Sequence, residues 1–171
     1  LPANNLGYEP EQPIAYSHAL HAGELKIACM YCHSGAEGSR YAGIPATSVC
    51  MNCHRYISAP FQQVEAERLA AEKESRPAKR IESPELRKLY DAMAFDEKMV
   101  PRRDKDPTPI SWVRVHNLPD FVRFDHRPHV GSGVTCQTCH GPIESMTRVK
   151  QFSRLSMGWC VNCHRDVNEH G

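Results

Sequence analysis

Four copies of one five-residue motif are the strongest chemical signal in the sequence. Each copy has two cysteines separated by two residues, and a histidine follows directly. Chance placement of a histidine after all four cysteine pairs has a probability on the order of 10^-5, so the repeated unit is CxxCH. The motifs contain Cys29, Cys32, His33, Cys50, Cys53, His54, Cys136, Cys139, His140, Cys160, Cys163 and His164.

The CxxCH spacing predicts covalent haem binding. The two thiols can add to the two vinyl groups of a haem, and the adjacent histidine becomes an axial ligand of the iron. Zinc ribbons built from pairs of CxxC are the main alternative, but zinc does not require a histidine at the same offset in every pair. Disulfides normally join separate elements. We therefore expect four covalently attached haems c.

Paired histidines supply candidates for the second axial ligand of each iron. Residues 16–21 and 124–129 both read aromatic-x-His-x-x-His, and each segment precedes a CxxCH motif. The number of paired histidines equals the number of motifs, so bis-histidine ligation is expected at all four irons. We assign His18 to the haem of the first motif and His126 to that of the third. His21 and His129 are expected to reach a neighbouring haem, and the sequence leaves open which one.

Two histidines lie outside this pattern. His116 and His170 are weaker candidate ligands, and an ordinary surface or hydrogen-bonding role suits either of them equally well. Methionine is the other common axial ligand of c-type haems, and Met146 and Met157 have the freedom to serve.

The motifs also reveal an internal duplication. Residues 14–57 run HxxH, CxxCH, CMNCHR, and residues 122–167 run HxxH, CxxCH, CVNCHR. We therefore divide the chain into an extended arm at 1–13, a di-haem module at 14–57, a helical insert with a surface loop at 58–120, and a second di-haem module at 121–171.

The insert has its own helix signals. Ser58 before Ala59-Pro60 predicts an N-cap for a helix over the following charged and apolar residues. Ser83-Pro84-Glu85 predicts a second, short helix, because serine caps and proline is favoured at the first helical position. Recurrent prolines predict an irregular surface loop over 96–119, in which Trp112–Val115 is either a short strand or a segment packed on a haem.

The composition predicts a small side-chain core. Aromatic residues make up 8% of the chain, thirteen prolines interrupt it, and its mean hydropathy is −0.55. We expect a mostly irregular and α-helical multihaem fold, built on the two duplicated di-haem modules with short helices and little sheet. The net charge of +1, with both signs intermixed, gives no footprint for nucleic acid. No apolar stretch approaches the eighteen or so residues of a membrane span.

Bis-histidine haems have no open coordination position for a substrate. Such haems transfer electrons, so no catalytic site is expected in this chain. The short spacing of the motifs crowds the haems, and crowded haems exchange electrons quickly. A soluble multihaem shuttle, and a multihaem reductase with one open haem, remain the alternatives.

Four stretches resemble a known family, the multihaem cytochrome c subunit of alternative complex III, and more broadly the class III and c7-like multihaem cytochromes. They are residues 7–54, 112–130, 136–146 and 157–165. The resemblance implies a subunit on the periplasmic side of a bacterial inner membrane, in a respiratory or photosynthetic complex that oxidises menaquinol. It also implies iron–sulfur and integral membrane quinol-binding subunits as partners, and a monohaem cytochrome c or another soluble protein as electron acceptor.

The sequence departs from that family in two respects. The family's subunit usually carries five haems and an N-terminal membrane anchor, whereas this sequence shows four CxxCH motifs and no anchor. We expect that a signal peptide or anchor was removed ahead of Leu1, since no methionine precedes it. A fifth haem, with His116 or His170 as a ligand, stays open.

Overall fold

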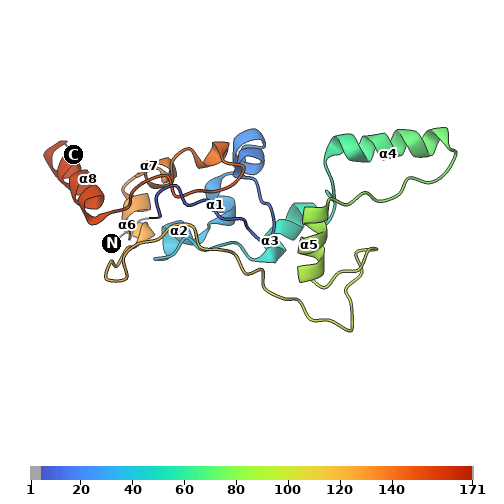
Figure 1. Cartoon of the computed structure of the whole chain (residues 1–171), viewed down its shortest axis with the longest axis horizontal. Helices are drawn as coiled ribbons and strands as arrows, with labels where there is room; N and C mark the ends of the chain where they lie inside the picture. Colours follow the sequence, from blue (N-terminus) through green and yellow to red (C-terminus); the bar gives the residue numbers. More distant parts are fainter. Residues whose placement is uncertain (1–4, 171) are drawn as a thin grey trace. The chain divides into compact units, whose positions relative to one another are not determined.

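The computed structural model describes residues 5–170, with side chains as far as Asn168. Short helices separated by irregular segments make up this part of the chain (Figure 1). No β-strand occurs within residues 5–170, although an isolated antiparallel bridge joins Phe95 and Pro101. The predicted fold class is therefore confirmed.

The helices are of two kinds. Four of them carry the CxxCH motifs: α1 (Cys29–Cys32), α3 (Thr47–His54), α7 (Cys136–His140) and α8 (Met157–His170). The others are α2 (Gly35–Gly38), α4 (Phe61–Lys73), α5 (Pro84–Ala92), α6 (His126–Gly131), the π-helical turn η1 (Ala19–Glu24) and the 3-10 turn η2 (Ile143–Ser145).

The chain divides into two compact units. Unit 1 consists of Leu1–Ile44 and Trp112–Gly171, and unit 2 consists of Pro45–Ser111. The boundary at residues 44 and 45 falls inside the first module that the repeat defines. The two units are defined by packing, whereas the modules are defined by the order of motifs in the sequence. The units therefore do not test the division into di-haem modules, which stays a prediction.

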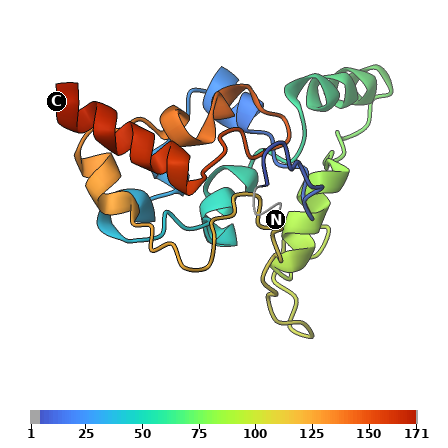
Figure 2. The ribbon, with the colours of Figure 1, turned by 60° about the vertical axis from the view of Figure 1, so that its left-hand side comes forward.

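Unit 1 is assembled from segments that are far apart in sequence. Turn η1 packs against η2, and α2 packs against α6. The two views place α6 beside α8 (Figure 2). Gln151 is fully buried, and its backbone bonds Gly7 and Tyr8 of the N-terminal arm. Because few large apolar side chains are buried in this unit, hydrogen bonds of this kind hold much of it together.

Unit 2 contains the two predicted helices of the insert. Helix α5 begins as expected, because the Ser83 side chain accepts a hydrogen bond from the backbone N–H of Leu86 at 3.2 Å. Helix α4 is confirmed, but the prediction of Ser58 as its N-cap is wrong. Pro60 occupies the cap position, while the buried Ser58 hydroxyl donates to the carbonyl of Ile81 at 2.6 Å. A buried hydroxyl with a partner of its own cannot serve the helix terminus.

The loop prediction holds for residues 96–119, which contain no helix. Trp112–Val115 forms no strand and instead runs as an irregular segment of unit 1.

Candidate haem-binding sites

Every CxxCH motif lies on a helical turn or a short helix. Residues three apart on a helix lie on the same face, so the two thiols of each motif point to one side. No disulfide joins any of the eight cysteines, all of which the structure describes. Among the described side chains, no group of three or more His, Cys, Asp or Glu residues is arranged to hold a metal ion directly.

The ring nitrogen Nδ1 of the candidate ligands faces a backbone carbonyl in several cases. The pairs are His21 with Ser17 at 2.9 Å, His33 with Gly43 at 2.7 Å, His54 with Ile57 at 2.8 Å, His126 with Arg40 at 3.0 Å and His129 with Asp125 at 2.8 Å. A carbonyl only accepts, so it fixes the proton on Nδ1 and leaves the lone pair on Nε2. That tautomer is the one that binds a metal through Nε2.

Two pairs of histidine rings face one another across a gap. The rings of His18 and His33 are 6.4 Å apart at their centroids and inclined by 5°. The rings of His129 and His164 are 6.0 Å apart and inclined by 27°. An imidazole nitrogen binds a transition metal at about 2 Å, so two rings on opposite sides of one metal have centroids about 6 Å apart.

The centroid distances of both ring pairs match the separation of two histidines on opposite sides of a haem iron. The Nδ1 of His18 is buried without a hydrogen-bond partner among the described residues, so no carbonyl fixes the tautomer of this ring. The arrangement supports His18 as the ligand opposite His33. It also suggests the fourth motif as the neighbouring haem that His129 reaches. Both assignments stay predictions.

The third motif has two further histidines near it. His140 interacts electrostatically with His116 and His126, and the His116 ring meets the His140 ring edge-on with centroids 4.4 Å apart. His126 is therefore among the histidines near the third motif, together with His33 and His18. The side chain of the other weak candidate, His170, lies outside the described residues.

Burial keeps several of these imidazoles neutral. It is the main cause that lowers the pKa of His18 to about 4, with His33 and His21 adding charge repulsion. Burial likewise lowers the pKa of His140 to about 4, helped first by His116. A neutral imidazole has the free lone pair that a metal requires.

The three motifs of unit 1 are neighbours. Burial and then the adjacent Cys29 raise the pKa of the Cys136 thiol, and the two side chains are hydrogen-bonded. Burial and then Cys163 and Cys160 raise the pKa of the Cys139 thiol. The first motif therefore adjoins the third, and the third adjoins the fourth.

Two comparisons with known proteins bear on these motifs. Residues 122–171 match the family model described as cytochrome c7 and related cytochrome c. We call residues 122–171 the c7-like segment. The c7-like segment contains the third and fourth motifs together with the second histidine pair, and the match supports covalent haem c binding there.

The second comparison covers nearly the whole chain. The chain is 26% identical over 159 residues to the menaquinone reductase, multiheme cytochrome c subunit, of Nitratidesulfovibrio vulgaris. The alignment includes 93% of this chain and 54% of the relative, so the chain spans about half the length of the curated relative that it matches. Together, the two matches support a multihaem cytochrome c that transports electrons.

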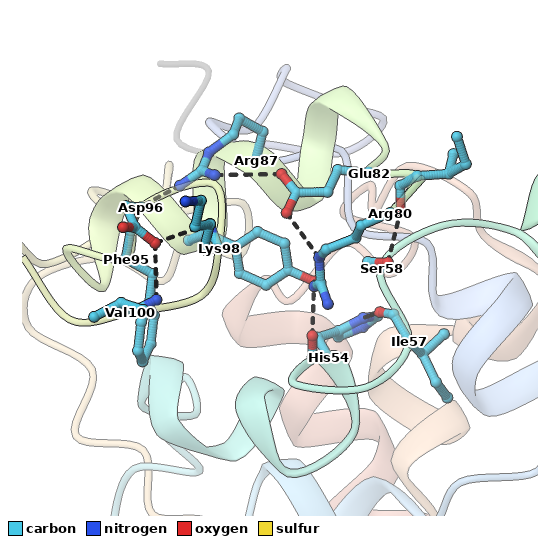
Figure 3. A network of polar contacts seen from close by, with 12 residues as sticks. His54, Ile57, Ser58, Arg80, Glu82, Arg87, Phe95, Asp96, Lys98 and Val100 are labelled. Atoms are coloured by element: carbon cyan, nitrogen blue, oxygen red, sulfur yellow. Dashed lines mark hydrogen bonds and ion pairs between the residues drawn. The ribbon is translucent and has the colours of Figure 1, made fainter. Parts of the chain in front are cut away.

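The second motif, which lies in unit 2 outside the c7-like segment, is held by the insert. The hydroxyl of Tyr90 on α5 donates to the carbonyl of His54 at 2.7 Å. Figure 3 shows His54 beside the polar contacts of Arg80, Glu82 and Arg87. Tyr90 is fully buried, and the guanidinium groups of Arg80 and Arg87 lie over its ring. Glu82 forms ion pairs with both arginines. This network fixes the end of α3 at the histidine of the motif.

Sequence reasoning missed Tyr90 and Gln151. Tyr90 follows Leu86 and Leu89 on an amphipathic helix, so the apolar stripe of α5 carried a signal for its burial. No sequence signal predicted the burial of Gln151, because it belongs to no periodic apolar pattern that would distinguish a buried glutamine from an exposed one. No helix among the described residues is long and apolar enough to cross a membrane.

Proposed function

We propose that this chain is an electron-relay subunit with four covalent, bis-histidine haems c. The observation that carries the proposal is the adjacency of the three motifs in unit 1, in which Cys29 adjoins Cys136 and Cys139 adjoins Cys160 and Cys163. Each haem, when bound, supplies a one-electron Fe(III)/Fe(II) couple. The chain's own residues set the spacing of the couples, and the paired imidazoles close each iron to other ligands.

The ligand set of the proposal follows the repeat. His33, His54, His140 and His164 serve as proximal ligands, and His18, His21, His126 and His129 serve as distal ligands. The carbonyls at Nδ1 hold five of these eight rings in the tautomer that presents Nε2.

We place the chain in a membrane-associated complex that exchanges electrons with menaquinol. The name of the relative, a menaquinone reductase subunit, and the resemblance to alternative complex III both support a quinone-linked complex. In this proposal the chain lies on the periplasmic side of a bacterial inner membrane. Iron–sulfur and integral membrane quinol-binding subunits are its partners, and a monohaem cytochrome c or another soluble carrier accepts the electrons.

The proposal is tested on the native complex purified from membranes. We expect four haems per chain by pyridine haemochrome assay, no carbon monoxide binding, and reduction of the haems by a menaquinol analogue only when the membrane subunits are present. The holo-chain separated from those subunits serves as the control. Purification as a free protein would favour the soluble shuttle, and binding of one carbon monoxide per chain would favour a reductase with an open haem.

The direction of electron flow is tested in the same preparation. Haems reduced by menaquinol and reoxidised by a soluble acceptor indicate quinol oxidation. Haems reduced by a soluble donor and reoxidised by menaquinone indicate quinone reduction, which would overturn the proposed direction and leave the relay intact.

A further inference from the structure

The segment Trp112–Asn117 is irregular but firmly held. The side-chain amide of Gln12 makes two hydrogen bonds to the backbone of Val113, at 2.8 and 2.9 Å. Asn5 donates to the carbonyl of Val115 at 3.2 Å. The backbone N–H of Asn117 donates to the side-chain oxygen of Gln151 at 3.0 Å. These bonds hold the backbone on both sides of His116 and so fix where this residue lies within unit 1.

The ring of His116 is directed at the proximal histidine of the third motif. Its Nε2 lies 3.1 Å from Nδ1 of His140, within hydrogen-bond distance, and the two rings meet at 81°. An imidazole that binds a metal through Nε2 carries its proton on Nδ1. His140 is therefore the donor of this bond, and the Nε2 of His116 is the acceptor.

The third motif differs in this respect from the first and second. The Nδ1 groups of His33 and His54 face the backbone carbonyls of Gly43 and Ile57. The acceptor at the third motif is a side chain, so a substitution can remove or replace it. The acceptors at the first and second motifs are backbone carbonyls, which a substitution leaves in place.

We propose that His116 is a positioning residue for His140, and that it lowers the reduction potential of the haem attached to Cys136 and Cys139. The proposal rests on the haem binding proposed above. An acceptor at Nδ1 makes the proximal imidazole a stronger electron donor and fixes the orientation of its ring. Stronger donation stabilises ferric over ferrous iron. The role also excludes His116 as an iron ligand through Nε2, since one nitrogen lone pair cannot serve both partners.

The test compares His116→Phe with His116→Gln in the holo-protein. Phenylalanine fills the space of the ring without an acceptor, whereas glutamine offers a carbonyl oxygen. Val115→Ala is the matched control, because it removes buried methyl groups beside His116 without touching the bond. Redox titration with spectroscopic detection resolves the four one-electron steps, and electron paramagnetic resonance reports whether each ferric haem stays low-spin.

We expect His116→Phe to raise one of the four midpoint potentials by about 59 mV, a tenfold change in a one-electron equilibrium. His116→Gln should recover most of that change, and Val115→Ala should leave all four potentials close to wild type. Equal shifts in Val115→Ala and His116→Phe would reduce the effect to packing and overturn the proposal.

Two other outcomes separate this inference from the proposed function. If His116→Phe keeps four haems and none of their midpoint potentials moves, the positioning role alone is overturned. The same holds if one haem of His116→Phe becomes high-spin and binds carbon monoxide. The second result would make His116 an iron ligand. A wild-type chain that carries no haem overturns the proposed function itself. If His116→Phe fails to assemble, the comparison of His116→Gln and His116→Asn with wild type still decides, because only the longer amide is expected to reach Nδ1.

Discussion

Residues 16–21 and 124–129 place their aromatic rings in almost the same arrangement. Tyr16 and Phe124 each meet the first histidine of their pair edge-on, with centroids 4.9 and 4.8 Å apart. Each aromatic ring is also inclined to the second histidine by a similar angle, 25° and 30°, with centroids 4.4 and 4.7 Å apart. The duplication in the sequence is therefore also a duplication of local geometry.

The two copies differ in what surrounds these rings. The first pair continues into the π-helical turn η1, and no side chain caps it at His18. The second pair begins α6, where Asp125 caps the helix by accepting from the N–H of Arg127. The difference shows that the ring arrangement is common to both copies although the helix that carries it is not.

The largest expected effect comes from removing one facing histidine in each copy. His18→Leu and His129→Leu should each open one iron if the facing ring is the second axial ligand, as proposed, and each should then gain about one carbon monoxide site per chain. Carbon monoxide difference spectra of the holo-proteins measure this. His18→Met and His129→Met are the matched variants, because methionine can still bind iron, and they should raise one potential without opening the haem. A variant in either copy that stays closed to carbon monoxide would show that the copies differ in ligation.

Exchanging the residue that follows the histidine of the motif should have the next largest effect. Gly141 follows His140 with φ 71° and ψ −164°, a region almost restricted to glycine, and a Cβ there would clash with Phe152. Its counterpart Ser34 has an ordinary helical φ of −59°. We expect Gly141→Ser to lower the free energy of unfolding by about 3 kcal/mol, the sum of strain and overpacking.

The reciprocal change, Ser34→Gly, is the control and should cost less than about 1 kcal/mol. Denaturant unfolding of the holo-proteins, followed by haem absorbance, compares the two. Equal losses would mean that the two copies tolerate this position alike, against the geometry of Gly141.

The sequence predicted the parts of the sites that depend on spacing along the chain. The CxxCH spacing, the aromatic–histidine pairs and the helices α4 and α5 all follow from local patterns, whereas the helical turns that carry the motifs were found only in the structure. The His116–His140 contact could not be predicted, because it joins residues 24 apart through an irregular segment. The misplaced cap at Ser58 has the same cause, since its true partner, Ile81, lies 23 residues away. Neither the sequence nor the ring geometry tests which histidine binds which iron, so this assignment stays a prediction.

The insert differs from the c7-like segment, because it supports the second motif through one hydroxyl group, that of Tyr90. Tyr90→Phe removes the hydrogen bond to the His54 carbonyl and should lower the free energy of unfolding of unit 2 by about 1 kcal/mol, the usual net value of such a bond. The matched control is Tyr56→Phe, since Tyr56 is 79% exposed, and it should have almost no effect. Hydrogen exchange at the backbone amides of α3 and α5 measures the local change. Equal exchange in the two variants would remove Tyr90 from the support of this motif.

The smallest expected effect tests one turn position that the two copies share. Lys26 and Gly133 each stand three residues before the first cysteine of a motif, with φ of 56° and 79°. The next residue in each copy donates to the carbonyl of the second histidine, Ile27 to His21 and Val134 to His129, both at 3.0 Å. The turn is therefore the same, and only one copy has the residue that suits a left-handed backbone.

We expect Lys26→Gly to stabilise the protein by about 0.5 to 1 kcal/mol. Glycine removes the strain of a Cβ in the left-handed region, but the greater conformational entropy of glycine in the unfolded chain offsets part of this gain. Lys26→Ala is the control for the lost charge, which acts on Glu144, and it should not stabilise. Gly133→Ala should destabilise by a similar amount, since open space surrounds the position and only the backbone strain is added. Thermal unfolding of the three holo-variants is the measurement. A loss of stability in Lys26→Gly, beyond that in Lys26→Ala, would mean that the first copy needs the lysine side chain and that the two turns are not equivalent.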